Sequence, residues 1–255
     1  MLSLATGRVT PSSPVTFPPL EDIRVGVVTT DVGIGPWFVP GGCDENGDDA
    51  VLVTQTVSLD CGGEVLPQWL EYQSSMLSQF RTDFGCKAQV GVDGCGFEQQ
   101  LEAMLKAITP STSTTEFYGP SSGHADGANA GFLRDEAVLV VVVVTDEEDC
   151  SAADIDLFNP DSTRYTTGLN ERCVDYPGAL HSISRFADGL ADLGRRVVYA
   201  PLVGMPEDLD GDPLTTILAD ERMVAAFDDL MPVNVCAGMA VRAGAAPRFV
   251  RVAQE

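Results

Sequence analysis

One apolar run constrains the fold of this chain more than any other segment. The eight residues from Ala137 to Val144 include six valines, and Thr145 and Asp146 follow them directly. β-branched residues favour strands, and a run without polar alternation is typical of a strand that is buried on both faces of a parallel sheet. The run is too short to span a bilayer. We therefore expect it to form the centre of a parallel sheet.

The segment that follows this run has the pattern of a β-α-β unit. Apolar residues at helical spacing predict a helix over about residues 177–193, which leads directly into a strand over residues 196–203. Two parallel strands joined by a helix form such a unit. Elsewhere the pattern predicts strands over 23–31 and 51–57, helices from Pro67 to about residue 80, over 97–108 and over 214–230, and one more element beginning near Phe249.

The order of these elements predicts an α/β fold. We expect a single doubly wound, mostly parallel sheet with helices on both faces, in a Rossmann-like arrangement. Residues 1–21 are rich in Ser, Thr and Pro and are expected to form a flexible segment. Residues 22–255 are expected to form one domain.

The charge balance limits the classes of partner. The chain has 15 Lys and Arg against 38 Asp and Glu, a net charge of −23. Such a polyanion repels phosphate backbones and anionic lipid head groups, which excludes nucleic-acid and membrane-surface binding. Cations and proteins with a basic surface are the favoured partners.

Seven cysteines indicate an oxidising compartment. None belongs to a C-x-x-C pair, so disulfides are a better interpretation than a zinc site. Short loops favour three pairs and leave Cys236 unpaired: Cys43–Cys61, Cys86–Cys95 and Cys150–Cys173. The N-terminus has no visible secretory signal. Between these two indications we favour an exported, extracytoplasmic protein, of which this chain is a mature or incomplete piece, without direct membrane insertion.

Acidic residues end two of the expected strands, at Asp31 and Asp146. Ligands of open parallel sheets bind at the carboxyl ends of the strands, and carboxylates are the hard oxygen ligands that Mg²⁺ and Ca²⁺ prefer. The two histidines, His124 and His181, lie in no zinc-binding or catalytic motif, and we expect both to be structural or surface residues. We do not expect an enzyme.

Four segments together resemble a known family: Val25 to Asp31, Gly94 to Ala103, Gly131 to Asp135 and Val144 to Ser151. They are similar to the von Willebrand factor A-like domains of exported proteins and lipoproteins in myxobacteria and related bacteria. The resemblance covers roughly residues 22–250. It implies a Rossmann-like sheet with a metal-ion-dependent adhesion site at its top edge.

The resemblance also implies a partial set of metal ligands. Asp146 matches the family's aspartate at the end of a strand, and Glu98 is the oxygen ligand nearest to the family's threonine position, where this chain has Cys95. Asp31 is the third candidate ligand. The D-x-S-x-S motif that the family places before Ile23 is missing, so we expect the chain either to begin downstream of the family's first strand or to have lost the site, and to bind Mg²⁺ or Ca²⁺ weakly.

The sequence leaves three functions open. The first is a non-catalytic adhesion module that recognises a protein ligand through the top edge of the sheet, with a divalent cation as an optional bridge. The second is a metal-assisted hydrolase that uses Asp31, Asp146 and Glu98. The third is a degenerate structural subunit without a metal site.

Overall fold

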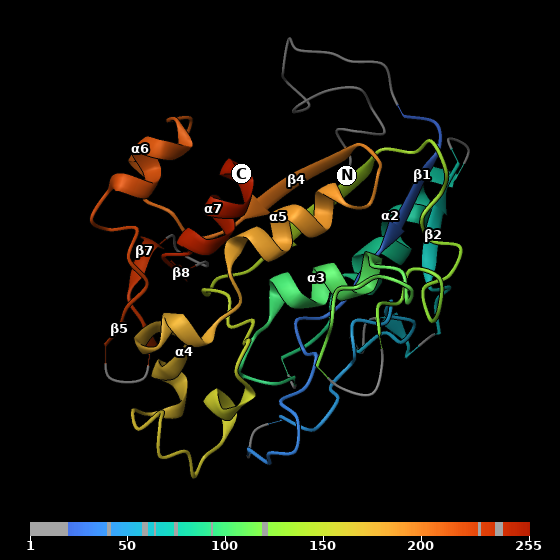
Figure 1. Ribbon diagram of the computed structural model, residues 1–255. Helices are drawn as coiled ribbons and strands as arrows, with labels where there is room; N and C mark the ends of the chain where they lie inside the picture. Colours follow the sequence, from blue (N-terminus) through green and yellow to red (C-terminus); the bar gives the residue numbers. More distant parts are fainter. Residues whose placement is uncertain are drawn as a thin grey trace. The chain divides into compact units, whose positions relative to one another are not determined.

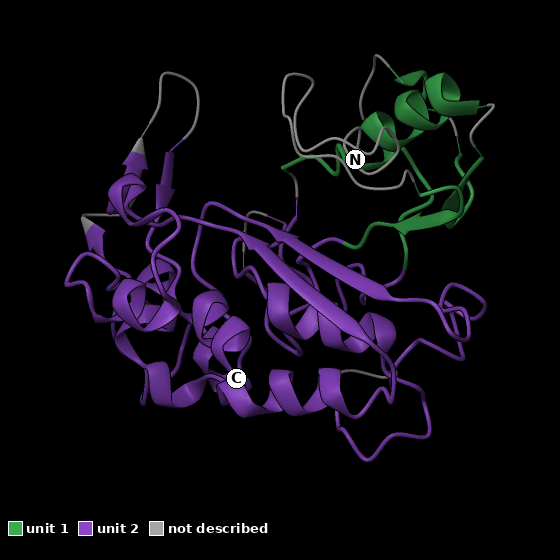
Figure 2. Ribbon diagram, turned by 90° about the horizontal axis from the view of Figure 1, so that it is seen from above, with its two compact units in different colours: residues 1–28, 52–92 green, residues 29–51, 93–255 purple. Residues whose placement is uncertain are grey.

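The computed structural model describes residues 20–39, 42–57, 61–63, 65–73, 76–92, 94–118, 122–228, 231–237 and 242–255. The chain divides into two compact units, where the sequence predicted one domain from residue 22 onward (Figure 2). Unit 1 contains residues 1–28 and 52–92, and unit 2 contains residues 29–51 and 93–255. Most of the expected flexible segment, residues 1–21, lies outside the described residues.

Unit 1 is built on an antiparallel pair of strands, β1 (Ile23–Gly26) and β2 (Trp69–Tyr72) (Figure 1). Helix α2 (Leu77–Lys87) packs against β2. Leu70, Tyr72 and Phe80 form the buried core between them, and the rings of Tyr72 and Phe80 lie 5.3 Å apart, edge to face. Unit 1 is therefore a small two-layer arrangement.

Two expectations for unit 1 are wrong. The helix expected from Pro67 begins only at Leu77, because Trp69 to Tyr72 pair with β1 as a strand. In this segment the spacing of apolar residues fits both a helix and the alternation of a strand, and strand pairing decides between them. Residues 51–57 form no strand and contribute an isolated bridge between Gln55 and Val65.

Unit 2 contains the expected β-α-β unit. The strands β3 (Leu139–Val144) and β4 (Val197–Leu202) are parallel, and α5 (Ile183–Ala191) lies between them in sequence. Helix α3 (Gln100–Ile108) is buried along its whole length and packs against α5, and α7 (Pro247–Gln254) packs against α5 and β4. The prediction of strand, helix and parallel strand over residues 137–203 is confirmed.

Within the described part of the chain the β3–β4 pair is covered on one face only, which contradicts the expectation that the apolar run is buried on both faces. Side chains alternate along β3: Val143 is buried, whereas Val142 and Val144 are exposed. Among the described strands, β3 pairs only with β4. The described residues therefore bury one face of this strand and leave the other face exposed.

The other described elements of unit 2 are short. The helix expected over 214–230 ends at Ala219. The strands pair in antiparallel fashion as β5 with β6 and β7 with β8. The bounds are η3 Ile155–Phe158, η4 Leu169–Glu171, α4 Arg172–Asp175, η5 Pro177–Ala179, η6 Glu207–Leu209, α6 Leu214–Ala219, β5 Phe227–Asp228, β6 Met231–Pro232, β7 Asn234–Ala237 and β8 Arg242–Gly244.

Three disulfides form, and each lies within one unit: Cys61–Cys86 in unit 1, and Cys43–Cys95 and Cys150–Cys173 in unit 2. The pair Cys150–Cys173 and the free Cys236 agree with the sequence prediction. The two other predicted pairs are wrong. Because each doubling of loop length costs only about 0.6 kcal/mol, a preference for short loops is weak beside the positions that the fold gives the cysteines.

Candidate functional site

The acidic run after β3 begins at the carboxyl end of that strand. Asp146 is exposed, and its backbone carbonyl accepts a hydrogen bond from the N–H of Gly244 (2.9 Å). The Thr145 hydroxyl accepts a hydrogen bond from the N–H of Glu147 (3.2 Å), which turns the chain away from the sheet. The run therefore leaves the strand at the edge where the sequence placed the candidate site.

Glu98 lies beside the start of this run. Its Oε2 accepts hydrogen bonds from Gln100 Nε2 (2.9 Å) and from the Thr145 hydroxyl (3.5 Å). Burial, together with the negative charges of Glu147 and Asp146, raises the pKa of Glu98 to about 7. The structure therefore brings Glu98 and Asp146 into the same electrostatic environment.

Two further features of this edge bear on the ligand it could hold. Gln100 Oε1 is buried, and no described residue donates a hydrogen bond to it. A cavity of about 40 Å³ is lined by residues that include Glu98, Glu147 and Glu148. That volume admits water or a single ion and is too small for an organic substrate. We call Glu98, Thr145, Asp146 and Glu147 the acidic edge.

Asp31, the third predicted ligand, belongs to a different acidic group. Its carboxylate is buried and accepts hydrogen bonds from the N–H groups of Gly33 (3.0 Å) and Cys95 (3.2 Å). Burial raises the pKa of Asp31, these hydrogen bonds oppose the rise, and the charges that add to it are those of Asp48 and Asp44. Within the described ranges, no three His, Cys, Asp or Glu side chains are arranged to hold a metal ion. The acidic edge offers oxygen donors, which a hard cation prefers. These donors are too few to fill the coordination shell of the cation.

The second half of the acidic run is structural. Asp149 is fully buried and accepts hydrogen bonds from Leu101 N–H (3.0 Å), the Ser151 hydroxyl (2.7 Å) and Arg248 Nε (3.0 Å). The Ser151 hydroxyl in turn accepts from the N–H of Glu102 (2.9 Å). These two side chains satisfy N–H groups in the first turn of α3, which a helix cannot satisfy itself.

Glu148 links the same run to α7. Its carboxylate accepts hydrogen bonds from the N–H groups of Arg248 (3.1 Å) and Asp149 (2.9 Å). Burial raises the pKa of Glu148 to about 8, against the opposing effect of these hydrogen bonds. Arg248 is thus a central residue that the sequence reasoning missed, because nothing local shows that α7 returns to this run.

Both histidines lie next to carboxylates. His124 Nε2 is 3.1 Å from Asp49, which also accepts a hydrogen bond from the buried Lys106. His181 Nε2 is 3.8 Å from Glu102, whose carboxylate accepts two hydrogen bonds from Arg185 (3.0 and 2.7 Å). Burial and the charges of two arginines lower the pKa of His181 to about 4, so this histidine is neutral at pH 7 and the contact with Glu102 is no ion pair.

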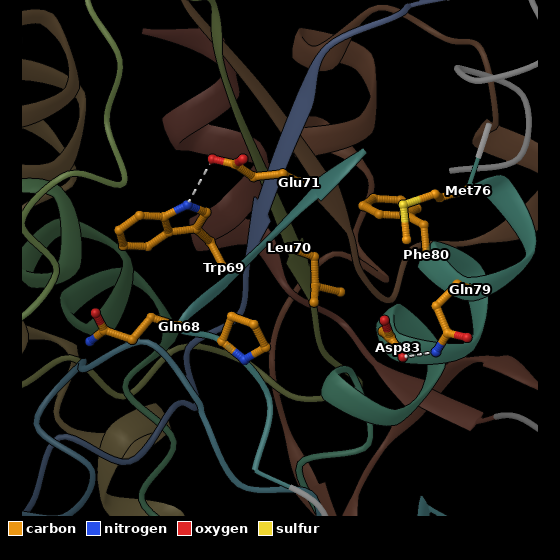
Figure 3. A pocket seen from close by; sticks show the side chains of 9 residues that line it. Gln68, Trp69, Leu70, Glu71, Met76, Gln79, Phe80 and Asp83 are labelled. Carbon is orange, nitrogen blue, oxygen red and sulfur yellow. Dashed lines mark hydrogen bonds between the residues drawn. The ribbon is translucent and has the colours of Figure 1, made fainter. Parts of the chain in front are cut away.

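Unit 1 contains a larger pocket, of about 520 Å³, between β2 and α2. The lining residues are Pro67, Gln68, Trp69, Leu70, Glu71, Met76, Gln79, Phe80 and Asp83 (Figure 3). Asp83 accepts a hydrogen bond from Gln79 (2.7 Å), and Glu71 forms an ion pair with Arg24 (2.8 Å). Among the lining residues that the structure describes there is no Ser, Cys, His or Lys, the usual nucleophiles and bases of enzymes.

The three disulfides are typical of a protein from an oxidising, extracytoplasmic compartment. In the described part of the chain, no helix has the length and apolar character needed to cross a membrane. Comparison with protein families, with curated proteins and with solved structures finds no match for this chain.

Proposed function

We propose that this chain is a non-catalytic binding module of an exported protein, located in the periplasm, in the outer membrane or at the cell surface. The acidic edge recognises a protein ligand, and a Mg²⁺ or Ca²⁺ ion bound there bridges to it. The observation that carries this proposal is the position of Glu98 within the field of Asp146 and Glu147 at the carboxyl end of β3.

A bridging cation suits the electrostatics of this chain. The three carboxylates and the hydroxyl of the acidic edge are hard oxygen donors, and Mg²⁺ takes six oxygen ligands, so water would complete the shell. The cation neutralises repulsion between the acidic edge and a carboxylate of the partner. A basic protein surface is the alternative partner that the same charge attracts.

The hydrolase alternative receives less support. It needs Asp31, Asp146 and Glu98 around one metal ion, whereas the charges that act on Asp31 belong to Asp44 and Asp48. The small cavity beside Glu98 leaves no room for a substrate inside the edge. A structural subunit without a cation site is the alternative that remains to be tested against the proposal.

Calorimetric titration with Mg²⁺, Mn²⁺ and Ca²⁺ tests the cation site. We expect the wild-type chain to bind with a Kd of about a millimolar, because the protein supplies few ligands. Asp146→Asn and Glu98→Gln should each weaken binding at least tenfold. The matched control is Asp188→Asn, an exposed carboxylate on α5, which should bind as the wild type does.

Two outcomes would contradict the proposal. Equal affinity in all four proteins would show only diffuse attraction to an acidic surface and would favour the structural subunit. Micromolar binding that Asp146→Asn leaves intact would place the site elsewhere.

A further inference from the structure

The β3–β4 pair presents one wholly apolar face. Parallel pairing aligns Val140 with Val198, Val142 with Ala200 and Val144 with Leu202. Partners in a parallel pair point to the same side of the sheet, and alternate residues along a strand share a face. These six side chains therefore form one continuous surface, which we call the even face.

The even face is exposed to an extent that is unusual for a parallel sheet. Exposed fractions are 51% for Val140, 54% for Val142, 70% for Val144, 49% for Val198 and 61% for Leu202. Parallel sheets occur almost only with both faces covered. Half-exposed branched side chains in one block reach the range of about 300–600 Å² that marks interaction surfaces. The residues that the structure describes leave this face open to a partner.

The charges at the two ends of the pair differ. The carboxyl end of β3 runs into Asp146 and Glu147, so it is strongly negative. At the amino end, Arg195 and Arg196 precede β4, and the segment before β3 adds Arg134, Asp135 and Glu136. Asp192 precedes β4 by as many residues as Arg134 precedes β3, so that end carries three cations and three anions and is neutral overall, in contrast to the acidic end.

We propose that a second copy of this chain covers the even face, with the two sheets packed face to face and their strands antiparallel. A two-fold axis makes such a contact self-complementary, because each copy contributes the same surface. The antiparallel arrangement keeps the two acidic ends apart and places each near the arginines of the other copy. Together the two faces bury on the order of 1,000 Å², which reaches the lower range of specific interfaces.

The oligomeric state of the full chain tests this proposal. Sedimentation velocity over a wide range of protein concentration should show a reversible monomer–dimer equilibrium. Val142→Lys and Leu202→Lys should each raise the dimer Kd at least tenfold, because they place a charge in an apolar contact. The matched control Val224→Lys changes a valine that is 65% exposed and lies outside the two strands, and it should leave the Kd unchanged.

The near-isosteric Val142→Thr separates loss of the contact from loss of the fold. This variant should retain the wild-type circular dichroism spectrum and still weaken the dimer. A wild-type chain that is monomeric at every concentration would overturn the proposal, and so would a dimer that survives both lysine variants.

Charge exchange tests the orientation. Arg196→Glu should weaken the dimer at least fivefold, and adding Asp146→Lys to the same chain should restore part of the affinity. Further weakening in the double variant would overturn the antiparallel arrangement.

Discussion

The two compact units differ strongly in net charge. Unit 1 contains four Lys and Arg against six Asp and Glu, a net charge of −2, whereas unit 2 contains eleven against 32, a net charge of −21. The acidity of the whole chain is therefore a property of unit 2. Arguments about partners that start from the net charge apply to the acidic edge and not to the pocket of unit 1.

The two main strand pairs differ in a second way. In β2, the inward Leu70 and Tyr72 alternate with Trp69 and Glu71 on the other face, which is ordinary for an antiparallel pair with one solvated face. Arg24 of β1 pairs with Glu71 and lies over the Trp69 ring, 5.2 Å from its centre. The even face of β3–β4 has no such polar cover. Within the described residues, the outer face of the unit 1 pair thus carries polar side chains, whereas that of the unit 2 pair is apolar.

Two tryptophans allow the units to be followed separately. The chain has only Trp37, in unit 2, and Trp69, in unit 1. A Trp37→Phe background therefore reports on unit 1 and a Trp69→Phe background on unit 2. The following predictions use urea unfolding of these two backgrounds by fluorescence.

The largest expected effect is loss of the buried Asp149. Asp149→Ala should lower the free energy of unfolding of unit 2 by about 3–5 kcal/mol, because it leaves the Arg248 guanidinium without its buried carboxylate.

Lys87→Met should lower the free energy of unfolding of unit 1 by a smaller amount, about 1–3 kcal/mol. It removes a buried cation whose ammonium donates to the carbonyls of Val53 and Gln68. The control Asp188→Ala should stay within about 0.5 kcal/mol of its parent. A larger loss from Lys87→Met than from Asp149→Ala would reverse the comparison.

Removal of a disulfide should affect only the unit that contains it. Replacing Cys61 and Cys86 by Ser should lower the stability of unit 1 by about 2–4 kcal/mol and leave the Trp37 signal of unit 2 unchanged. Replacing Cys150 and Cys173 should have the reverse effect.

Alkylation of the non-reduced wild type, followed by mass measurement, should find one free thiol, that of Cys236. Equal destabilisation of both signals by either pair of substitutions would show that the units unfold as one.

The third effect depends on pH and concerns Glu148. Its pKa is raised to about 8 from 4.5, so the protonated form is favoured by folding. The stability from this group is full below pH 4.5 and is lost as the pH rises through 8. Glu148→Gln removes the titration and should therefore be more stable than the wild type by roughly 1–3 kcal/mol at pH 9. At pH 5 the two proteins should differ little. A difference that does not change with pH would contradict the assignment.

The smallest expected effect is that of salt. Because unit 2 carries −21, screening should raise its free energy of unfolding by about 1 kcal/mol or less between low and high ionic strength. Unit 1 is nearly neutral and should change less. Urea unfolding of the two single-tryptophan backgrounds at several NaCl concentrations checks this. Equal responses would show that the charge difference has no consequence for stability.

Sequence reasoning located the elements whose signal is local. The runs that became β3, α3, α5 and β4 were recognised because apolar periodicity depends on neighbouring residues alone. It failed at Trp69–Tyr72, where a short segment fits both periods and pairing with β1 decides. It gave no sign that Asp149 is fully buried, only three residues after the exposed Asp146. The buried Asp149 accepts a hydrogen bond from Arg248, which lies about a hundred residues further along the chain.

The sequence by itself determined the parallel unit of residues 137–203, the excess of acid and the odd number of cysteines, because these follow from local pattern and composition. Only the tertiary structure decided that Cys43 pairs with Cys95, that the charges acting on Asp31 are those of Asp44 and Asp48, and that the described residues leave one face of β3–β4 exposed. Each of these depends on which distant segments meet. The entropic cost of closing loops of different length differs by only fractions of a kilocalorie per mole. Side-chain packing therefore decides which distant segments come together.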